Sequence, residues 1–352
     1  MDSVKVLMKG NEAIAEAAIR AGCDAYFGYP ITPQTEVLEY MSRRMPELGR
    51  AFVQAESELG AINMVYGATC TGARAMTTTS SPGFSLMQEA ISYIALSFVP
   101  CVIVNVMRGG PGLGNIQPAQ GDYFQMTKGG GHGDYSLIAL APSTVQEPVD
   151  LVIEAFDLAD RYLQPVTVIA DGMIGQIMEP VSFPELGRAE RPAQPWALKG
   201  ARARRKNVIT SLYLGGEKLE MENLRLQKII GEIRAAEVRN AEFMMDGAEL
   251  VIVAYGTAGR IAQTAIRRAR AEGIAGGLFR PISMFPFPYD RLDEISGTAK
   301  QILVVELSAG QMIEDVRLAT RSRIPIEFYG RMGGLVPLPE DILAEIERLA
   351  QR

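Results

Sequence analysis

The feature that most constrains the fold is the alternation of short apolar runs with amphipathic segments along residues 1–185. The apolar runs have the length and composition of β-strands, and the segments between them have helical periodicity. Strand-like runs occur at 4–8, 25–28, 51–54, 73–79, 101–107, 136–140 and 166–170, and helical segments at 11–21, 33–45, 57–71, 84–97 and 145–163. Strands that alternate with helices of this length form βαβ units, so the pattern predicts a parallel sheet covered by helices.

The pattern changes twice along the 352 residues, a length at which two domains are expected. Residues 186–246 carry several prolines, a basic cluster and a highly charged helical segment at 217–243. Residues 247–352 return to alternating strands and helices. We therefore predict an α/β fold with two parallel-sheet domains, 1–185 and 247–352, joined by the helical linker 186–246.

Composition excludes several classes of function. The net charge of −6 provides no basic excess for nucleic acid or an anionic membrane, and no apolar run is long enough to span a bilayer. Three scattered cysteines without a C-x-x-C pair, and one histidine, predict no zinc site, no iron–sulfur cluster held by this chain and no metal site. The amino terminus lacks the apolar core of a signal peptide, so we expect a cytoplasmic protein.

A strand-to-helix turn at residues 28–36 explains both the end of a strand and the start of a helix. Pro30 cannot donate to a strand ladder. Thr32 followed by Pro33 gives a side-chain oxygen at the N-cap and proline at the first helical position. Ligands of open α/β sheets bind at the carboxyl ends of the strands, so this turn faces a predicted binding crevice.

The turn after residues 51–54 places two carboxylates, Glu56 and Glu58, at the start of a helix. The helix macrodipole favours negative charge there, so a structural role is sufficient for both. The helix that follows is nearly all small or apolar, however, and we expect it to be buried. Because a buried carboxylate needs a specific partner, the residues alone leave a structural and a functional role equally open.

Two further turns carry polar residues. Arg108 follows the apolar run 101–107, where it would either clamp a substrate carboxylate or pair with Asp or Glu. Beyond it, residues 108–134 contain nine glycines, typical of a functional loop whose backbone approaches a ligand closely. His132 in this loop is a possible substrate contact, with a plain loop histidine as the simpler interpretation. Ser81 and Gly83 end a hydroxyl-rich turn and are possible ligand contacts.

In combination, these motifs resemble the alpha subunit of the 2-oxoacid:ferredoxin oxidoreductases, a family of thiamine diphosphate enzymes. The resemblance rests on residues 29–33 (YPITP), residues 57–61 (SELGA) and Arg108 after its apolar run. It covers nearly the whole chain, and implies a pyrimidine-binding domain followed by a transketolase C-terminal-like domain. Within the family, residues 63–67, 108–115 and 128–134 are most similar to the branched-chain, 2-oxoisovalerate type, with the 2-oxoglutarate type as the alternative.

The resemblance implies roles for individual residues. Glu58 matches the catalytic glutamate that hydrogen-bonds the cofactor's aminopyrimidine ring and supports its reactive tautomer, with Glu56 as the alternative. Tyr29 and Pro30 belong to the same cofactor-binding motif. Thr32 and Arg108 match the groups that hold the 2-oxoacid carboxylate.

The resemblance also implies partner chains, because a Mg²⁺–diphosphate motif is incomplete here: only Ala170-Asp171-Gly172 approaches it, and residues 195–202 contain no asparagine. We expect thiamine diphosphate shared with a beta subunit that supplies Mg²⁺ and a [4Fe-4S] cluster, gamma and ferredoxin-like delta subunits, CoA as co-substrate and ferredoxin as acceptor, in a dimer of heteromers. The implied reaction converts 2-oxoisovalerate and CoA to acyl-CoA, CO₂ and reduced ferredoxin, or the reverse. The alternatives are half of a non-redox thiamine diphosphate lyase and a non-catalytic scaffold subunit.

Overall fold

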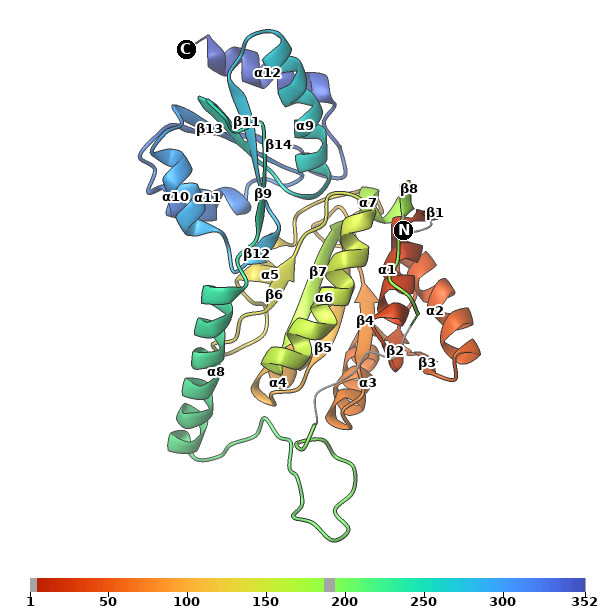
Figure 1. Ribbon diagram of the computed structural model, residues 1–352. Helices are drawn as coiled ribbons and strands as arrows, with labels where there is room; N and C mark the ends of the chain where they lie inside the picture. The colour runs from red at the N-terminus through yellow and green to blue at the C-terminus, as the bar shows by residue number, and fades with distance from the viewer. Residues whose placement is uncertain (1–4, 187–193, 352) are drawn as a thin grey trace.

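The structure is a computed structural model that describes residues 5–186 and 194–351, and it contains two α/β units stacked end to end (Figure 1). The larger sheet of the described residues has seven strands in the order β12-β6-β7-β5-β4-β2-β3. All neighbours in it pair in parallel except β12 and β6. These strands are β2 (Ala25–Gly28), β3 (Ala51–Gln54), β4 (Ala75–Thr79), β5 (Cys101–Met107), β6 (Ile138–Leu140), β7 (Pro165–Asp171) and β12 (Ser283–Phe285).

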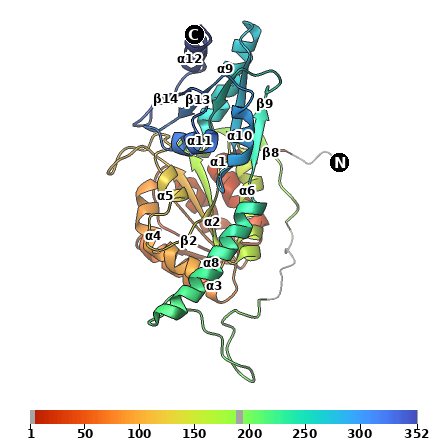
Figure 2. The ribbon, with the colours of Figure 1, turned by 90° about the vertical axis from the view of Figure 1, so that its left-hand side faces the viewer.

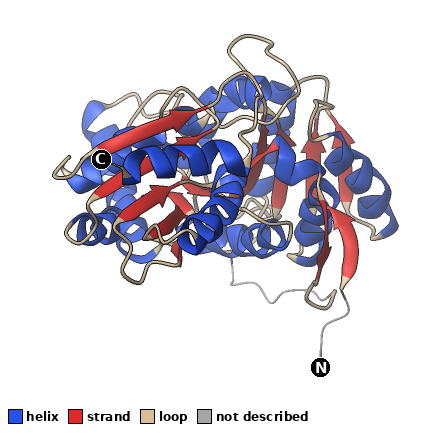
Figure 3. Cartoon of the chain, turned by 90° about the horizontal axis from the view of Figure 1, so that it is seen from above, coloured by secondary structure: helices blue, strands red, loops and turns tan. Residues whose placement is uncertain are grey.

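The central strands of this sheet are buried on both faces, as a parallel sheet between two helical layers requires. Viewed from above, the strands are enclosed by helices (Figure 3). One face packs against α1 (Gly10–Arg20), α2 (Thr35–Glu47) and α6 (Gln146–Tyr162). The other packs against α3 (Glu58–Cys70) and α4 (Ser81–Leu96), and α8 (Gly216–Ala236) lies across α4 (Figure 2).

The second sheet has five strands in the described residues, in the order β14-β13-β10-β11-β9, parallel except for β9. They are β9 (Asn240–Phe243), β10 (Leu250–Val253), β11 (Gly276–Pro281), β13 (Gln301–Glu306) and β14 (Ile326–Gly330). The remaining helices are α5 (Tyr123–Thr127), α7 (Gly172–Gln176), α9 (Gly256–Ala271), α10 (Tyr289–Ser296), α11 (Met312–Thr320) and α12 (Pro339–Ala350). None of the helices in the described ranges is long and apolar enough to cross a lipid bilayer.

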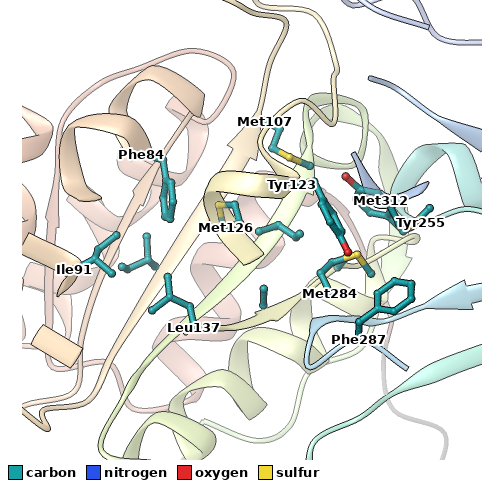
Figure 4. Close-up of a cluster of buried hydrophobic side chains, with 14 of the residues drawn as sticks. Phe84, Ile91, Met107, Tyr123, Met126, Leu137, Tyr255, Met284, Phe287 and Met312 are labelled. Atoms are coloured by element: carbon teal, nitrogen blue, oxygen red, sulfur yellow. The ribbon is translucent and has the colours of Figure 1, made fainter. Parts of the chain in front are cut away.

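The two units share a continuous apolar core. Tyr123 of the first unit lies beside Tyr255 and Met312 of the second, with ring centroids of the two tyrosines 6.2 Å apart (Figure 4). Met284 of β12 and Phe287, two residues after the end of β12, belong to the same cluster. Because β12 leaves the second unit and pairs with β6 of the first sheet, the units are joined by packing as well as by the linker.

The α/β class and the parallel sheets are confirmed, whereas the place of one predicted strand and the bounds of two predicted helices were wrong. The strand predicted at 4–8 is β1 (Val6–Lys9), which pairs antiparallel with β8 (Met178–Val181) apart from the main sheet; residue 4 lies outside the described residues. The helix predicted at 217–243 ends at Ala236, since the chain then enters β9.

The third wrong prediction is the helix start at Thr32 and Pro33, because α2 begins at Thr35. The carbonyl of Pro33 is held instead by the side-chain amides of Asn11, at 2.7 Å, and Gln176, at 3.0 Å. The domain boundaries at 185 and 247 stay a prediction; β9 precedes the second of them and pairs within the second sheet.

Candidate functional site

The predicted turns meet at one edge of the larger sheet. Strands β5, β4, β2 and β3 are consecutive neighbours and parallel, so their carboxyl ends share an edge. Each of these strands is followed there by one of the turns singled out in the sequence. The fold therefore gathers Thr32, Glu58, Ser81 and Arg108 on one side of the sheet.

Glu58 is the first residue of α3, and its side chain is only 5% exposed. Ser57 is the N-cap, with its hydroxyl accepting from the Gly60 N–H at 3.1 Å. The Glu58 side chain lies against Gly83 of α4, where a methyl group would come within 2.6 Å of Glu58 Oε1. Among the described residues, no group donates a hydrogen bond to this carboxylate. Buried carboxylates are normally hydrogen-bonded, so a carboxylate without a donor at this position is unusual.

Glu56 has a different environment. It is exposed, and its carboxylate lies beside Gly60 over the first turn of α3. Negative charge at that position stabilises a helix through its macrodipole. This position supports a structural role for Glu56, one of the two roles that the sequence left open.

The sequence predicted that the helix beginning at Glu58 is buried. The structure buries only one side of this helix. Leu59 is 45% exposed, Asn63 and Gly67 are exposed, and Met64 is half-buried. The inner residues pack on the sheet, and the outward side of the helix is exposed. That side begins with Leu59, one residue after Glu58.

Arg108 is held over the same edge by two backbone carbonyls. Its Nη1 donates to the Thr32 carbonyl at 3.0 Å and its Nη2 to the Leu113 carbonyl at 2.9 Å, while its buried Nε has no acceptor among the described residues. No described carboxylate lies within ion-pair distance of this guanidinium. The alternative in which Arg108 pairs with an Asp or Glu side chain of this chain is therefore wrong for the described residues. The charge of Arg108 remains unpaired.

Ser81 anchors the backbone beneath Arg108. Its hydroxyl accepts from the Arg108 N–H at 3.0 Å and donates to Asp122 Oδ2 at 2.5 Å. Asp122 also accepts from Asn105 Nδ2 at 2.9 Å. Burial raises the pKa of Asp122, although these hydrogen bonds and the charge of Arg108 oppose the rise. Asp122 was missed in the sequence because nothing in the glycine-rich segment distinguishes it from a solvated loop residue.

Arg108 opens onto a cavity of about 470 Å³ between the two units. Its walls come from the start of α4, the glycine segment after β5 and the loops that follow β13 and β14. The lining residues are Ser81, Pro82, Ser85, Arg108, Gly109, Gly110, Pro111, Gly112, Ala119, Gly121, Asp122, Leu307, Ser308, Ala309, Gln311, Met332 and Gly333. Arg108 is the one cation among them.

The remaining predicted residues fall at the rim of the site or away from it. Tyr29 is half-buried, with its carbonyl accepting from Gln34 Nε2 at 3.3 Å, and Pro30 and Thr32 are exposed on the same turn. His132 is exposed, and its ring contacts Tyr93 with centroids 6.3 Å apart. Tyr93 lies ten residues after the glycine that contacts Glu58, roughly 15 Å along α4, so His132 does not join the site.

Asp171, the near match to a metal motif, is already fully bonded. It is 1% exposed and caps α7 by accepting from the Met173 and Ile174 N–H groups, both at 3.2 Å. It also accepts from Thr257 of the second unit, at 2.8 Å from the N–H and 2.6 Å from the hydroxyl. Asp171 therefore joins the two units, and both its oxygens are occupied.

A second buried carboxylate, Asp315 on α11, ties the glycine segment to the second unit. It accepts from the Tyr123 hydroxyl at 2.6 Å, from the Tyr289 hydroxyl and from Lys128 Nζ at 2.6 Å. Lys128 begins the run of glycines at 129–131. The loop that the sequence marked as functional is thus fixed at one end by an ion pair between the units.

The fold and the site define a two-unit α/β protein with a buried, unpaired acid at the mouth of its larger parallel sheet. Two family models match the chain: "Pyruvate flavodoxin/ferredoxin oxidoreductase, thiamine diP-bdg" over residues 16–239, and "Pyruvate:ferredoxin oxidoreductase core domain II" over residues 248–342. The chain belongs to the 2-oxoacid:ferredoxin oxidoreductase family.

The chain is similar along nearly its whole length to subunits of two kinds of 2-oxoacid oxidoreductase. It is 52% identical to the ketoisovalerate oxidoreductase subunit VorB of Methanothermobacter thermautotrophicus, over 98% of this chain and 97% of that one. It is 37% identical to the 2-oxoglutarate synthase subunit KorA of Archaeoglobus fulgidus, over 97% and 98%. Its structure matches the 2-oxoglutarate:ferredoxin oxidoreductase of Magnetococcus marinus with a TM-score of 0.90 at 27% identity, over 99% of this chain and 66% of that longer one.

Proposed function

We propose that this chain is the alpha subunit of a cytoplasmic branched-chain 2-oxoacid:ferredoxin oxidoreductase. The complex would convert 2-oxoisovalerate and CoA to acyl-CoA, CO₂ and reduced ferredoxin, or run the reverse reaction. The choice of substrate is supported by 52% identity to a ketoisovalerate oxidoreductase subunit, against 37% to a 2-oxoglutarate synthase subunit. It is also supported by the lining of the cavity, because a second substrate carboxylate would find no second cation among those residues.

The observation that carries the proposal is the buried, unpartnered carboxylate of Glu58. The aminopyrimidine ring of thiamine diphosphate offers a nitrogen that can share a proton with such a group. When bound, this cofactor supplies the carbanion chemistry of decarboxylation. Glu58 would hold the proton at the ring nitrogen, and Gly83 leaves room for the carboxylate to lie in its buried position. The residues of this edge therefore fit the pyrimidine end of the cofactor, with Tyr29 and Pro30 at its rim.

The substrate carboxylate would bind beside this position. Arg108 is oriented by the carbonyls of Thr32 and Leu113 and faces the cavity with its charge unpaired. A guanidinium can hold a carboxylate by two parallel charge-assisted hydrogen bonds. We assign Arg108 to the clamp, Thr32 to the turn that positions it, and Ser81 to the support beneath it.

The diphosphate end of the cofactor does not fit this chain. Asp171 has both oxygens occupied, and no group of three or more His, Cys, Asp or Glu side chains in the described residues is placed to hold a metal ion. We therefore assign the Mg²⁺–diphosphate site and a [4Fe-4S] cluster to a beta subunit. Gamma and ferredoxin-like delta subunits would complete the electron path, in a dimer of heteromers. The exposed apolar side chain of Leu59 on α3 supports such a partner, because it lies next to Glu58.

The test is to purify the native complex and measure methyl viologen reduction with 2-oxoisovalerate, 2-oxoglutarate and pyruvate. The proposal expects CoA-dependent reduction with the highest kcat/KM for 2-oxoisovalerate. Preference for 2-oxoglutarate would reassign the chain to the 2-oxoglutarate type. Decarboxylation without an iron–sulfur chromophore would favour a non-redox lyase, and a complex whose activity does not need this chain would favour a scaffold.

A further inference from the structure

The turn that orients Arg108 is itself held by two side-chain amides from elsewhere in the chain. Asn11, at the start of α1, donates from Nδ2 to the Pro33 carbonyl at 2.7 Å and to Glu36 Oε2 at 2.8 Å. Gln176, at the end of α7, donates from Nε2 to the same two oxygens, at 3.0 Å each. Four hydrogen bonds therefore converge on one carbonyl and one carboxylate at the approach to α2.

The amide of Asn11 serves only as a donor. Its side chain is 0% exposed, and its Oδ1 has no hydrogen-bond partner in the part of the chain that the structure describes. Turning the amide over would place Oδ1 against a carbonyl and a carboxylate, which only accept hydrogen bonds. Lys9 forms an ion pair with the other oxygen of Glu36 at 3.2 Å, so that carboxylate is held as well. The nitrogen of Asn11 is therefore fixed between two oxygens of the turn.

The Pro33 carbonyl is rigidly connected to the group that accepts from Arg108. Arg108 Nη1 donates to the Thr32 carbonyl at 3.0 Å. The peptide bond between Thr32 and Pro33 is planar, and the pyrrolidine ring locks the φ of Pro33. One soft dihedral therefore lies between the two carbonyls, whereas two would lie there with another residue in place of proline. A side chain that fixes the Pro33 carbonyl consequently restricts the direction of the Thr32 carbonyl and of the guanidinium bonded to it.

We propose that Asn11 is a positioning residue for the Arg108 clamp, with Gln176 as a second support of the same carbonyl. It keeps the Thr32 carbonyl, and with it the guanidinium, aligned for the 2-oxoacid carboxylate. Because Asn11 is fully buried within the chain, it acts through the turn and not by touching the substrate. The inference rests on the proposed function, since Arg108 is a clamp only in a chain that binds a 2-oxoacid.

Asn11→Leu, in the complex with its partner subunits, tests this inference. Leucine keeps the approximate shape of asparagine and removes both hydrogen bonds. The variant should assemble, because Gln176 and Lys9 still donate to the Pro33 carbonyl and to Glu36. The KM for 2-oxoisovalerate should rise about three- to tenfold, the effect of about one net hydrogen bond. The kcat and the Kd for thiamine diphosphate should stay within about twofold of the wild type, because weaker substrate binding alone raises KM and not kcat.

Gln164→Met is the matched control. Gln164 is also a buried amide, 1% exposed, whose Nε2 donates to two carbonyls, of Ala95 at 3.1 Å and of Leu163 at 2.9 Å. Its Oε1 likewise has no partner among the described residues. It precedes β7, at the opposite end of that strand from α7. Methionine removes these hydrogen bonds at similar size, so this variant should lower the urea midpoint without changing the KM.

A double-mutant cycle with Arg108→Ala shows whether Asn11 acts through the clamp. In the Arg108→Ala background, Asn11→Leu should change the KM by less than about twofold, because the group that it positions is gone. An equal rise in both backgrounds, an unchanged KM in Asn11→Leu, or an equal rise in Gln164→Met would overturn the inference. If Asn11→Leu does not assemble, Gln176→Met removes the other donor to the same carbonyl and is judged by the same criteria.

Arg108→Ala by itself keeps the two ideas apart. A raised KM in Arg108→Ala beside an unchanged KM in Asn11→Leu overturns this inference alone. A wild-type KM in Arg108→Ala removes Arg108 from the substrate site, so the proposed function loses its clamp as well.

Discussion

Replacing Arg108 by alanine removes the one cation that lines the cavity between the two units. In the proposed complex its guanidinium forms two charge-assisted hydrogen bonds with the 2-oxoacid carboxylate. A hydrogen bond to a charged group contributes roughly 1.5–3 kcal/mol, and Arg108 is half-buried, so we take roughly 2–3 kcal/mol for the pair. That loss corresponds to a rise in KM of roughly 30- to 150-fold.

The assay is the KM for 2-oxoisovalerate in methyl viologen reduction by the reconstituted complex. The Kd for thiamine diphosphate, measured alongside, should change little, since Arg108 donates to Thr32 and Leu113 and not to Glu58. Arg44→Ala is the matched control, because Arg44 pairs with Glu47 on the outside of α2. A KM within twofold of the wild type for Arg108→Ala would remove Arg108 from the substrate site.

Two further predictions concern buried carboxylates. Asp315→Ala should lower the free energy of unfolding by roughly 2–4 kcal/mol, because it leaves the buried Tyr123 hydroxyl and Lys128 without their partner; an unchanged urea midpoint would contradict this. Burial raises the folded-state pKa of Asp122 above the unfolded value of 3.8. Keeping the Asp122 carboxylate charged in the folded protein therefore costs stability at pH 7. That cost disappears as the pH falls through the raised pKa toward 3.8. The Asp122→Asn variant should therefore have a higher urea midpoint than the wild type at pH 7, and the difference between the two midpoints should shrink as the pH is lowered. A difference that does not depend on pH would contradict a raised pKa of Asp122.

The order of strands and helices could be read from the sequence because apolar runs and helical periodicity are local signals. The errors fell where a tertiary contact overrides such a signal. The side chains of Asn11 and Gln176 capture the carbonyl of Pro33 and move the start of α2 to Thr35. Residues 240–243 are a strand because the edge of the second sheet is available beside β11.

The site was predictable to the extent that it lies on strand-to-helix turns. The sequence singled out Glu58 and Arg108 as candidates, but the residues alone did not separate Glu58 from Glu56. Which of these two carboxylates points toward Gly83 depends on the fold. Asp122 gave no signal, since a loop aspartate is common in non-functional positions. What it contributes comes from contacts with Ser81 and Asn105, which are far away in the sequence.

The measurement that tests the account most directly is the turnover of a complex carrying Glu58→Gln, with its subunit composition and cofactor content determined in the same preparation. The account predicts an assembled complex whose kcat is lower by roughly 10²–10⁴-fold, because glutamine cannot share a proton with the ring nitrogen. Wild-type turnover by the assembled variant would contradict it.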